Sequence, residues 1–185
     1  MGQISVEHDA GGIKGLCVIT PTVHGDRRGY FSETYNLRDM QEAGIDTVFV
    51  QDNQSSSTKG VLRGLHFQIH YPQAKLVRVI RGRVFDVAVD VRKDSPTFGK
   101  WYGIELTEEN HKQLFIPRGL AHGFLVLSDT AEFCYKCDDF WHSNDEGGII
   151  WNDPDIAIAW PDVDVPLTLS DKDRALPELK EAVLP

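Results

Sequence analysis

Apolar and polar residues alternate in short stretches along most of the chain, a pattern that predicts β-strands. The clearest example spans residues 84–92, where Phe85, Val87 and Val89 alternate with smaller or polar side chains. Strand character is also found over residues 14–20, 30–35, 48–51, 61–68, 75–81, 101–106, 112–116, 123–127, 132–137, 149–152 and 156–160. Gly82 separates two of these stretches, at a position where we expect a hairpin turn.

Helical patterns are few and short. They cover residues 37–43 and about 170–178, the second beginning with an N-cap-like arrangement of Ser170 and Asp173. Many short strands at a spacing of roughly 8–12 residues indicate a sandwich or barrel. We therefore predict an all-β jelly-roll barrel with short terminal helices. It forms one domain over residues 1–185, in which residues 161–185 are a C-terminal extension.

Composition narrows the function classes. The formal net charge of −9 argues against a general nucleic-acid binder. No apolar stretch approaches the length of a membrane span, and the chain does not open on a signal-peptide pattern, so the expected location is cytoplasmic. The three cysteines do not form a disulfide framework, and the isolated pair Cys134 and Cys137 is interpreted as structural.

Two glycine–histidine stretches, residues 60–68 and 116–124, stand out as candidate chemistry. Their histidines, His66 and His122, can exchange protons near neutral pH, and Arg63 can bind a phosphate. Strict alternation would place Arg63 and His66 on opposite faces of a strand. We therefore predict a bulge at Gly64 that brings both into one cavity.

Further polar groups interrupt apolar strands, among them Lys75 and Tyr135, and their burial is unfavourable unless they are paired or serve a ligand. A metal site is not expected. Barrels of this type often use a His-x-His pair followed by a glutamate, but Gln68 stands at the second histidine position and the next glutamate is Glu105.

Taken in order, the motifs resemble those of the dTDP-4-dehydrorhamnose 3,5-epimerases, nucleotide-sugar epimerases of the cupin-like jelly-roll class. The matching residues are Asp26-x-Arg28-Gly29-Tyr30-Phe31-x-Glu33, Gln51-Asp52-Asn53, Val61-Leu62-Arg63-Gly64-Leu65-His66-Phe67-Gln68, Lys75-Leu76-Val77-Arg78, Phe85-Asp86-Val87-Ala88-Val89-Asp90, Pro117-x-Gly119-x-Ala121-His122-Gly123-Phe124, Tyr135-Lys136, Trp151-Asn152-Asp153-Pro154 and Ser170-Asp171-Lys172-Asp173. They extend over nearly the whole chain.

The resemblance implies a reaction without a cofactor. A dTDP-4-keto-6-deoxy-D-glucose would be inverted at C3 and C5 to dTDP-4-keto-L-rhamnose by proton abstraction and reprotonation through an enolate. His66 matches the general base and Asp173 the carboxylate that orients it. Tyr135 matches the acid on the opposite face, and Lys75 the cation beside the enolate oxygen.

The same resemblance implies a set of substrate contacts and a homodimer. The contacts are Arg28, Glu33, Gln51, Asp52, Asn53, Arg63, His122, Trp141, Glu146 and Lys172. In the family the N-terminal strands, here within residues 1–35, are exchanged in the dimer, so Arg28 and Glu33 are candidates for the partner's site. Two departures are Ala74, where relatives often carry glycine, and Phe140-Trp141, where they often carry tyrosines.

Three alternatives stay open on the sequence. The first is a relative that inverts only C3 or only C5 of a related dTDP-4-keto-deoxysugar. The second is a non-catalytic cupin-like binding domain, which would not need His66, Asp173, Tyr135 and Lys75 together. The third is a metal-dependent cupin oxygenase, which the missing ligands disfavour.

Overall fold

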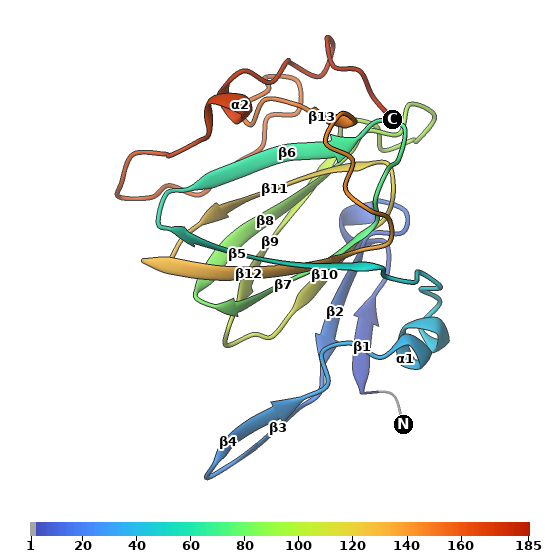
Figure 1. Cartoon of the computed structure of the whole chain (residues 1–185), viewed down its shortest axis with the longest axis vertical. Coiled ribbons are helices and arrows are strands. Elements are labelled where there is room, and N and C mark those ends of the chain that lie inside the picture. Colours follow the sequence, from blue (N-terminus) through green and yellow to red (C-terminus); the bar gives the residue numbers. More distant parts are fainter. Residues whose placement is uncertain (1–2) are drawn as a thin grey trace.

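Two antiparallel β-sheets face each other in the computed structural model, which describes residues 3–185 (Figure 1). Residues 1–2 of the expected domain lie outside the described residues. The six-stranded sheet runs in the order β1 (Ile4–Glu7), β2 (Cys17–Pro21), β10 (Gln113–Ile116), β7 (Lys75–Arg81), β12 (Thr130–Cys137) and β5 (Gln51–Thr58). The five-stranded sheet runs β13 (Glu146–Gly148), β6 (Leu62–Gln68), β11 (Leu120–Val126), β8 (Arg83–Asp90) and β9 (Trp101–Thr107).

The remaining elements are small. They are the hairpin β3 (Val23–Asp26) and β4 (Gly29–Ser32), the 3-10 turn Ala10–Gly12, and the helices α1 (Leu37–Glu42) and α2 (Asp171–Arg174). The all-β prediction is therefore confirmed. Among the described residues, no helix is long and apolar enough to span a membrane.

Apolar side chains from both sheets fill one end of the space between them. Val77, Leu114 and Phe133 of the six-stranded sheet pack there with Ala88 and Val126 of the five-stranded sheet, all nearly inaccessible to solvent. The alternation expected for residues 75–81 is confirmed, because Val77 and Val79 face this core while Leu76 belongs to a cluster on the other face.

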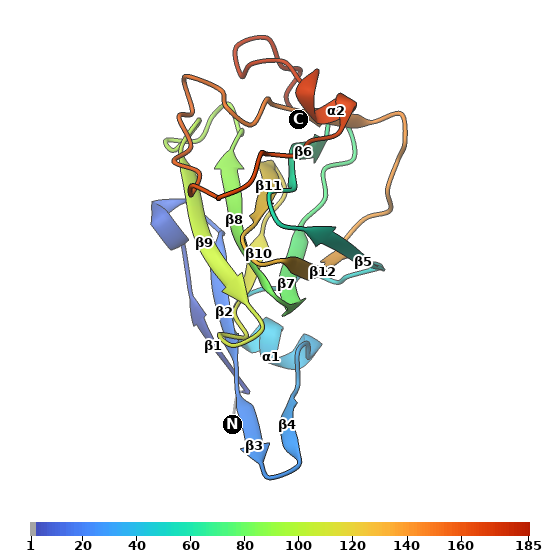
Figure 2. The ribbon, with the colours of Figure 1, turned by 90° about the vertical axis from the view of Figure 1, so that its left-hand side faces the viewer.

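The C-terminal segment covers the outer face of the five-stranded sheet (Figure 2). Ile156, Trp160 and Leu179 pack there against Val87 and Val89. The strands expected over residues 149–152 and 156–160 are wrong. Ile149 exchanges two backbone hydrogen bonds with Leu65 of β6 but no strand continues beyond it, and Ile156 and Trp160 are buried by packing on the sheet without joining it. The helix expected over residues 170–178 is limited to α2, and Pro177 disfavours helical backbone at the residue before it.

Gly82 is not the hairpin turn that its position suggested. The strands on either side, β7 and β8, belong to different sheets, so the chain crosses at Gly82 from one sheet to the other. Its φ of +79° suits glycine, and a Cβ atom there would lie only 2.1 Å from the Thr130 carbonyl oxygen. The crossing is therefore a tightly packed corner of the jelly roll.

The position predicted for strand β5 was wrong. The expected strand over residues 48–51 ends where β5 begins, and β5 itself contains no apolar residue. It is nevertheless paired along its whole length with β12, from Gln51 opposite Cys137 to Thr58 opposite Thr130. Backbone hydrogen bonding at the edge of the sheet holds this polar strand, which a search for apolar alternation does not detect.

The bulge predicted at Gly64 is confirmed. Between the partner pairs His66–His122 and Arg63–Phe124, strand β6 advances three residues while β11 advances two. The strands approach so closely that a Cβ on Gly64 would lie 2.6 Å from the Gly123 Cα atom. Two facing glycines therefore permit the extra residue that turns Arg63 and His66 towards one cavity.

Replacement of Gly123 by alanine should lower the free energy of unfolding by about 1–3 kcal/mol. The new Cβ would lie 2.7 Å from the Arg63 carbonyl oxygen, which belongs to backbone and cannot easily move. Urea unfolding measures the change. Gly25→Ala is the matched control, since its nearest atom lies 3.8 Å away and its effect should stay within about 0.5 kcal/mol. Equal effects in both variants would contradict the steric explanation.

Candidate functional site

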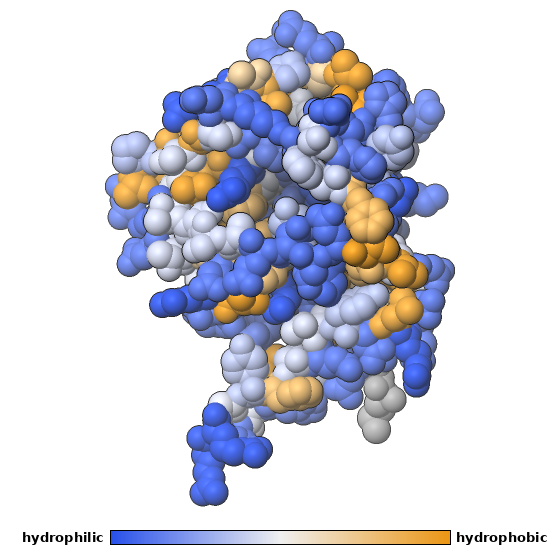
Figure 3. All heavy atoms as spheres, viewed as in Figure 1, coloured by the Kyte–Doolittle hydropathy of each residue, from blue (hydrophilic) through white to orange (hydrophobic). Residues whose placement is uncertain are grey.

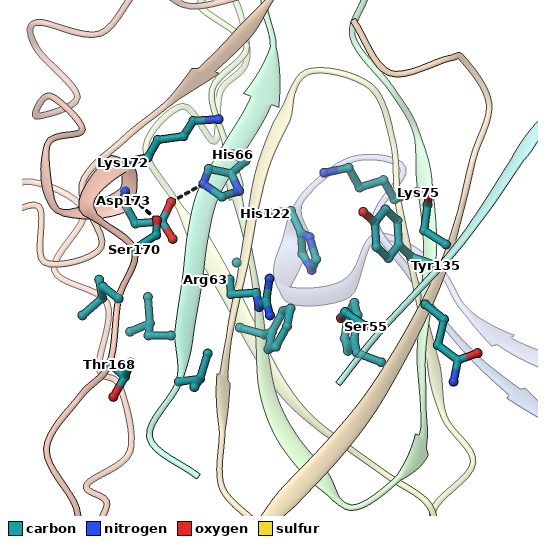
Figure 4. Close-up of a pocket in the computed structure, with 18 of the residues that line it drawn as sticks. Ser55, Arg63, His66, Lys75, His122, Tyr135, Thr168, Ser170, Lys172 and Asp173 are labelled. Carbon is teal, nitrogen blue, oxygen red and sulfur yellow. Dashed lines mark hydrogen bonds and ion pairs between the residues drawn. The ribbon is translucent and has the colours of Figure 1, made fainter. Parts of the chain in front are cut away.

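A cavity of about 830 Å³ opens between the two sheets, beyond the end that the apolar core fills. Strands β5, β6, β7, β11 and β12 and the segment 168–173 line it (Figure 4). Phe124 and Phe133 form an apolar wall. On the face drawn in Figure 3, hydrophilic residues predominate around the recess between α2 and β5. The cavity is thus accessible to a polar ligand.

His66 and Asp173 meet on one wall of this cavity, although 107 residues separate them in the chain. The His66 Nε2 atom lies 2.6 Å from Asp173 Oδ1. Ser170 caps α2 by accepting a hydrogen bond from the Asp173 backbone N–H, which fixes the start of the helix. The other ring nitrogen of His66, Nδ1, has no hydrogen-bond partner among residues 3–185.

Asp173 is held as an anion. Burial by itself raises the pKa of this carboxyl group, but hydrogen bonds from His66, Ser170 and the Gly64 backbone N–H bring the pKa below its ordinary value. In the neutral imidazole tautomer that donates its Nε2–H to an ionised Asp173, Nδ1 of His66 has a free lone pair. This arrangement suits a proton acceptor.

Lys75 and Tyr135 line the same cavity from neighbouring strands β7 and β12 (Figure 4). Burial raises the pKa of the Tyr135 phenol, so the phenol keeps its proton. Burial lowers the pKa of Lys75, while the nearby charges of Asp86 and Glu146 act in the opposite direction. A phenol that keeps its proton and a lysine amine therefore face the cavity from its second wall.

Arg63 lines the cavity on the side formed by β6. Its guanidinium Nε and Nη2 atoms donate to Ser57 Oγ at 3.2 and 3.0 Å, and no carboxylate of the described residues pairs with it. Asp52 and Asn53 of β5 also line the cavity. An arginine without an acidic partner at the edge of a cavity can bind a phosphate group.

A second recess of about 550 Å³ adjoins the first and shares His66, Lys75 and Tyr135 with it. Phe140 and Trp141 border it with side chains that are more than half exposed. Three interactions tie this loop to the predicted contact residues. The Trp141 backbone N–H donates to Gln51, its indole N–H donates to Glu146, and Glu146 pairs with Lys172.

Two of the expected site residues, Arg28 and Glu33, do not reach the cavity of their own chain. Arg28 lies on the β3–β4 hairpin, which extends away from the sheets (Figures 1 and 2). Its side chain is 84% exposed and pairs with Asp26 on the same hairpin. Glu33 accepts a hydrogen bond from Asn36. Any role of these residues at a cavity would require a second copy of the chain.

Sequence reasoning gave Asp86 no role, yet the structure places it directly behind the cavity. Asp86 is fully buried, and its Oδ2 atom lies 2.9 Å from Nε2 of His122, which lines the cavity. The available signal was an acidic residue on the inward face of a strand, in register with Val84 and Ala88. Within residues 3–185, no group of three His, Cys, Asp or Glu side chains is arranged to hold a metal ion.

The chain is similar to known proteins over most of its length. A family model described as dTDP-4-dehydrorhamnose 3,5-epimerase matches residues 11–181. A dTDP-4-dehydrorhamnose 3,5-epimerase of Methanothermobacter thermautotrophicus is 53% identical over 170 residues, which is 91% of this chain and 92% of that protein.

Solved structures similar to this chain are also epimerases of deoxysugar nucleotides. The crystal structure of a dTDP-6-deoxy-D-glucose-3,5-epimerase from Legionella pneumophila, in complex with dTDP-4-keto-L-rhamnose, superposes with a TM-score of 0.94. It is 47% identical, covering 98% of this chain and 97% of that one. A 3'-monoepimerase from Streptomyces bikiniensis, in complex with dTDP-quinovose, gives a TM-score of 0.84 at 36% identity, covering 90% of this chain and 85% of that one.

Replacement of Asp173 by asparagine should destabilise the fold by on the order of 1–3 kcal/mol at pH 7, because the variant lacks the charge that its hydrogen-bond donors stabilise. The folded-state pKa of Asp173 is lowered, so this contribution is complete above the unfolded value of about 3.9 and is lost as the pH falls through the folded value.

Urea unfolding at neutral pH and at successively lower pH values below 4 measures this effect. The difference between wild type and Asp173→Asn should shrink with increasing acidity. The control is Asp171→Asn in the same helix turn, an exposed position that should change stability by less than about 0.5 kcal/mol. A difference that stays constant down to the acid limit would refute the assignment of Asp173 as an anion.

Proposed function

The chain belongs to the dTDP-4-dehydrorhamnose 3,5-epimerase family, and we propose that it performs the family's reaction with His66, Asp173, Tyr135 and Lys75 as its catalytic groups. It is an isomerase. The observation that carries the proposal is one cavity in which the His66–Asp173 pair lines one wall while Lys75 and Tyr135 line the other. The substrate is dTDP-4-keto-6-deoxy-D-glucose and the product dTDP-4-keto-L-rhamnose.

His66 is the proposed base. Hydrogens on C3 and C5 are acidic because each carbon flanks the C4 ketone, and loss of either proton gives an enolate. Nδ1 of His66 takes the proton, and the imidazolium that forms is stabilised by the ionised Asp173 at Nε2. Because both carbons adjoin the same ketone, one base can serve them in turn after the sugar shifts in the cavity.

Tyr135 is the proposed acid. Inversion requires that the new proton arrive on the face opposite the one that the base attacked, and Tyr135 comes from the wall opposite His66 (Figure 4). Its raised pKa keeps the phenol protonated until a carbanion-like carbon accepts the proton. The Lys75 ammonium stabilises the negative charge that gathers on the C4 oxygen.

The nucleotide half of the substrate fits the polar rim. Arg63 has no acidic partner among the described residues and can bind the diphosphate. Phe140 and Trp141 present exposed aromatic faces on which thymine can stack, and Gln51, Asp52, Asn53, Glu146 and Lys172 supply polar contacts. His122 lines the sugar end of the cavity. No step uses a metal or redox cofactor.

The enzyme is proposed to act as a homodimer in the cytoplasm. The β3–β4 hairpin carries Arg28 away from its own cavity, which suits a contact with the site of a second copy. Tyr30 and Phe31 on the same hairpin are 66% and 70% exposed, an unusual state for aromatic side chains unless a partner covers them. The three cysteines are free thiols, as is usual in a reducing compartment.

Incubation of the protein with dTDP-4-keto-6-deoxyglucose in deuterated water should place deuterium at both C3 and C5, observed by proton NMR. His66→Asn should reduce exchange at both carbons by at least about 10²-fold, since general base catalysis contributes that much or more. His8→Asn, outside the cavity, is the control histidine and should exchange normally.

Other results of this experiment would indicate a different activity or a different base. Deuterium at one carbon would indicate a single-site epimerase, and no deuterium would indicate a binding domain. Normal exchange in His66→Asn would remove His66 as the base. Treatment with a chelator should leave the rate unchanged.

Arg28→Ala should raise the KM of the dTDP-sugar because a diphosphate contact is lost, and mixing experiments decide which subunit makes that contact. In a mixed dimer of His66→Asn and Arg28→Ala chains, a contribution from the partner would leave one site with both its own His66 and the partner's intact arginine. Mixed dimers isolated from coexpressed chains should then have up to half of the wild-type activity at low substrate concentration. Mixed dimers that perform no better than the average of the two parents would show that Arg28 acts within its own chain.

A further inference from the structure

A second histidine–carboxylate pair faces the cavity beside the first. His122 on β11 lies directly opposite His66 on β6 in the strand register. Each histidine contacts a buried carboxylate through Nε2: His66 contacts Asp173 at 2.6 Å, and His122 contacts Asp86 at 2.9 Å. The two pairs have the same composition, and they differ in the surroundings of the carboxylates and of the rings.

These surroundings differ sharply. Four other buried aspartates each accept hydrogen bonds from several donors: Asp90, Asp145, Asp153 and Asp173. Asp86 has one donor, His122, and its Oδ1 atom is buried without a hydrogen-bond partner among the described residues. Lys75 lies near enough to feel the charge of Asp86 but forms no ion pair with it. A lone anion at Asp86 is therefore poorly stabilised.

The number of protons on the His122–Asp86 pair sets its charge. If Asp86 is ionised and His122 neutral, the buried pair carries an uncompensated negative charge. The pair becomes neutral overall when it gains one proton, either as an imidazolium beside a carboxylate or as a neutral imidazole beside a carboxylic acid. In both neutral arrangements Nε2 faces Asp86 and the hydrogen of the other nitrogen is present, so Nδ1 of His122 is a donor.

Packing around the ring supports this arrangement. The His122 ring lies nearly parallel to Phe133, with centroids 5.9 Å apart and an interplanar angle of 22°. Phe133 stacks in turn on Phe124, at 4.3 Å and 16°. An aromatic face favours a cation, and the stack fixes the plane of the imidazole. Nδ1 has no partner among the described residues, and His122 lines the cavity between His66 and the Lys75–Tyr135 wall (Figure 4).

We propose that His122 presents an Nδ1–H donor to the C4 oxygen of the bound keto sugar, and that Asp86 is a positioning residue that keeps the hydrogen on this nitrogen. The proposal rests on the proposed function. His122 transfers no proton; its hydrogen bond strengthens as the ketone oxygen becomes an enolate oxygen, whose charge it shares with Lys75. The His66–Asp173 pair thus acts as the proton acceptor, and the His122–Asp86 pair acts as a hydrogen-bond donor.

The first test observes the nitrogen directly in the wild-type protein. With ¹⁵N-labelled histidine, NMR at pH 7 should give Nδ1 of His122 the shift of a nitrogen that bears hydrogen. Nδ1 of His66 should have the shift of a nitrogen with a free lone pair. In Asp86→Asn a neutral amide can accept the Nε2–H without an extra proton, so Nδ1 of His122 should lose its hydrogen. A free lone pair on His122 Nδ1 in the wild type would overturn the proposal.

The second test is kinetic. His122→Phe keeps an aromatic ring in the stack but removes the donor, and it should lower kcat by about 10²–10³-fold. Asp86→Asn should show a loss of the same kind. His122→Asn restores an N–H near the position of Nδ1 and should stay within about tenfold of the wild type. In all three variants the Kd for dTDP should change little, because the nucleotide is bound elsewhere. His8→Phe, outside the cavity, is the control.

The outcomes separate this proposal from the function on which it rests. Failure of the wild type to exchange deuterium with the keto sugar would sink the proposed function. Normal exchange together with a fully active His122→Phe would sink only the role of His122. If His122→Phe does not fold, as thermal unfolding would reveal, the wild-type NMR measurement and His122→Asn decide the matter.

Discussion

The close contact of β6 and β11 at Gly64 and Gly123 is the constraint on which the site depends. Without side chains at these two positions the strands approach closely enough for β6 to carry one extra residue. Without that residue, alternation would point Arg63 and His66 to opposite faces of the sheet. Arg63 and His66, the proposed phosphate-binding group and the proposed base, therefore share a cavity because of a local irregularity in an otherwise regular ladder.

The same sheets provide two kinds of environment within one cavity. Asp173 lies at the edge of the sheet on a short helix, where several donors contact its carboxylate. Asp86 lies inside the sandwich, where His122 is its one hydrogen-bond donor among residues 3–185. Two histidines that face each other across neighbouring strands are thereby paired with carboxylates that have different hydrogen-bond partners. Position in the fold, and not residue type, assigns the chemistry of each pair.

The sequence predicted those features that depend on residues close together in the chain. The strand over residues 75–81 matched β7 because period-two alternation is strong there, and the bulge at Gly64 followed from the conflict between alternation and a shared cavity. Long-range pairing was not predictable in this way. Strand β5 has no apolar residue, the crossing at Gly82 depends on which sheet each neighbour joins, and the isolation of Asp86 is visible only in three dimensions. The pairing of His66 with Asp173 followed from family resemblance, since no spacing rule links positions so far apart.

The position of Asp173 also bears on how the protein is made. The residues that form most of the cavity lie before residue 136, yet the carboxylate that pairs with His66 follows only at residue 173. During synthesis the strands that line the cavity are therefore present before Asp173 is. The pair proposed as the base is complete only when the segment 168–173 has been made and has folded over the cavity.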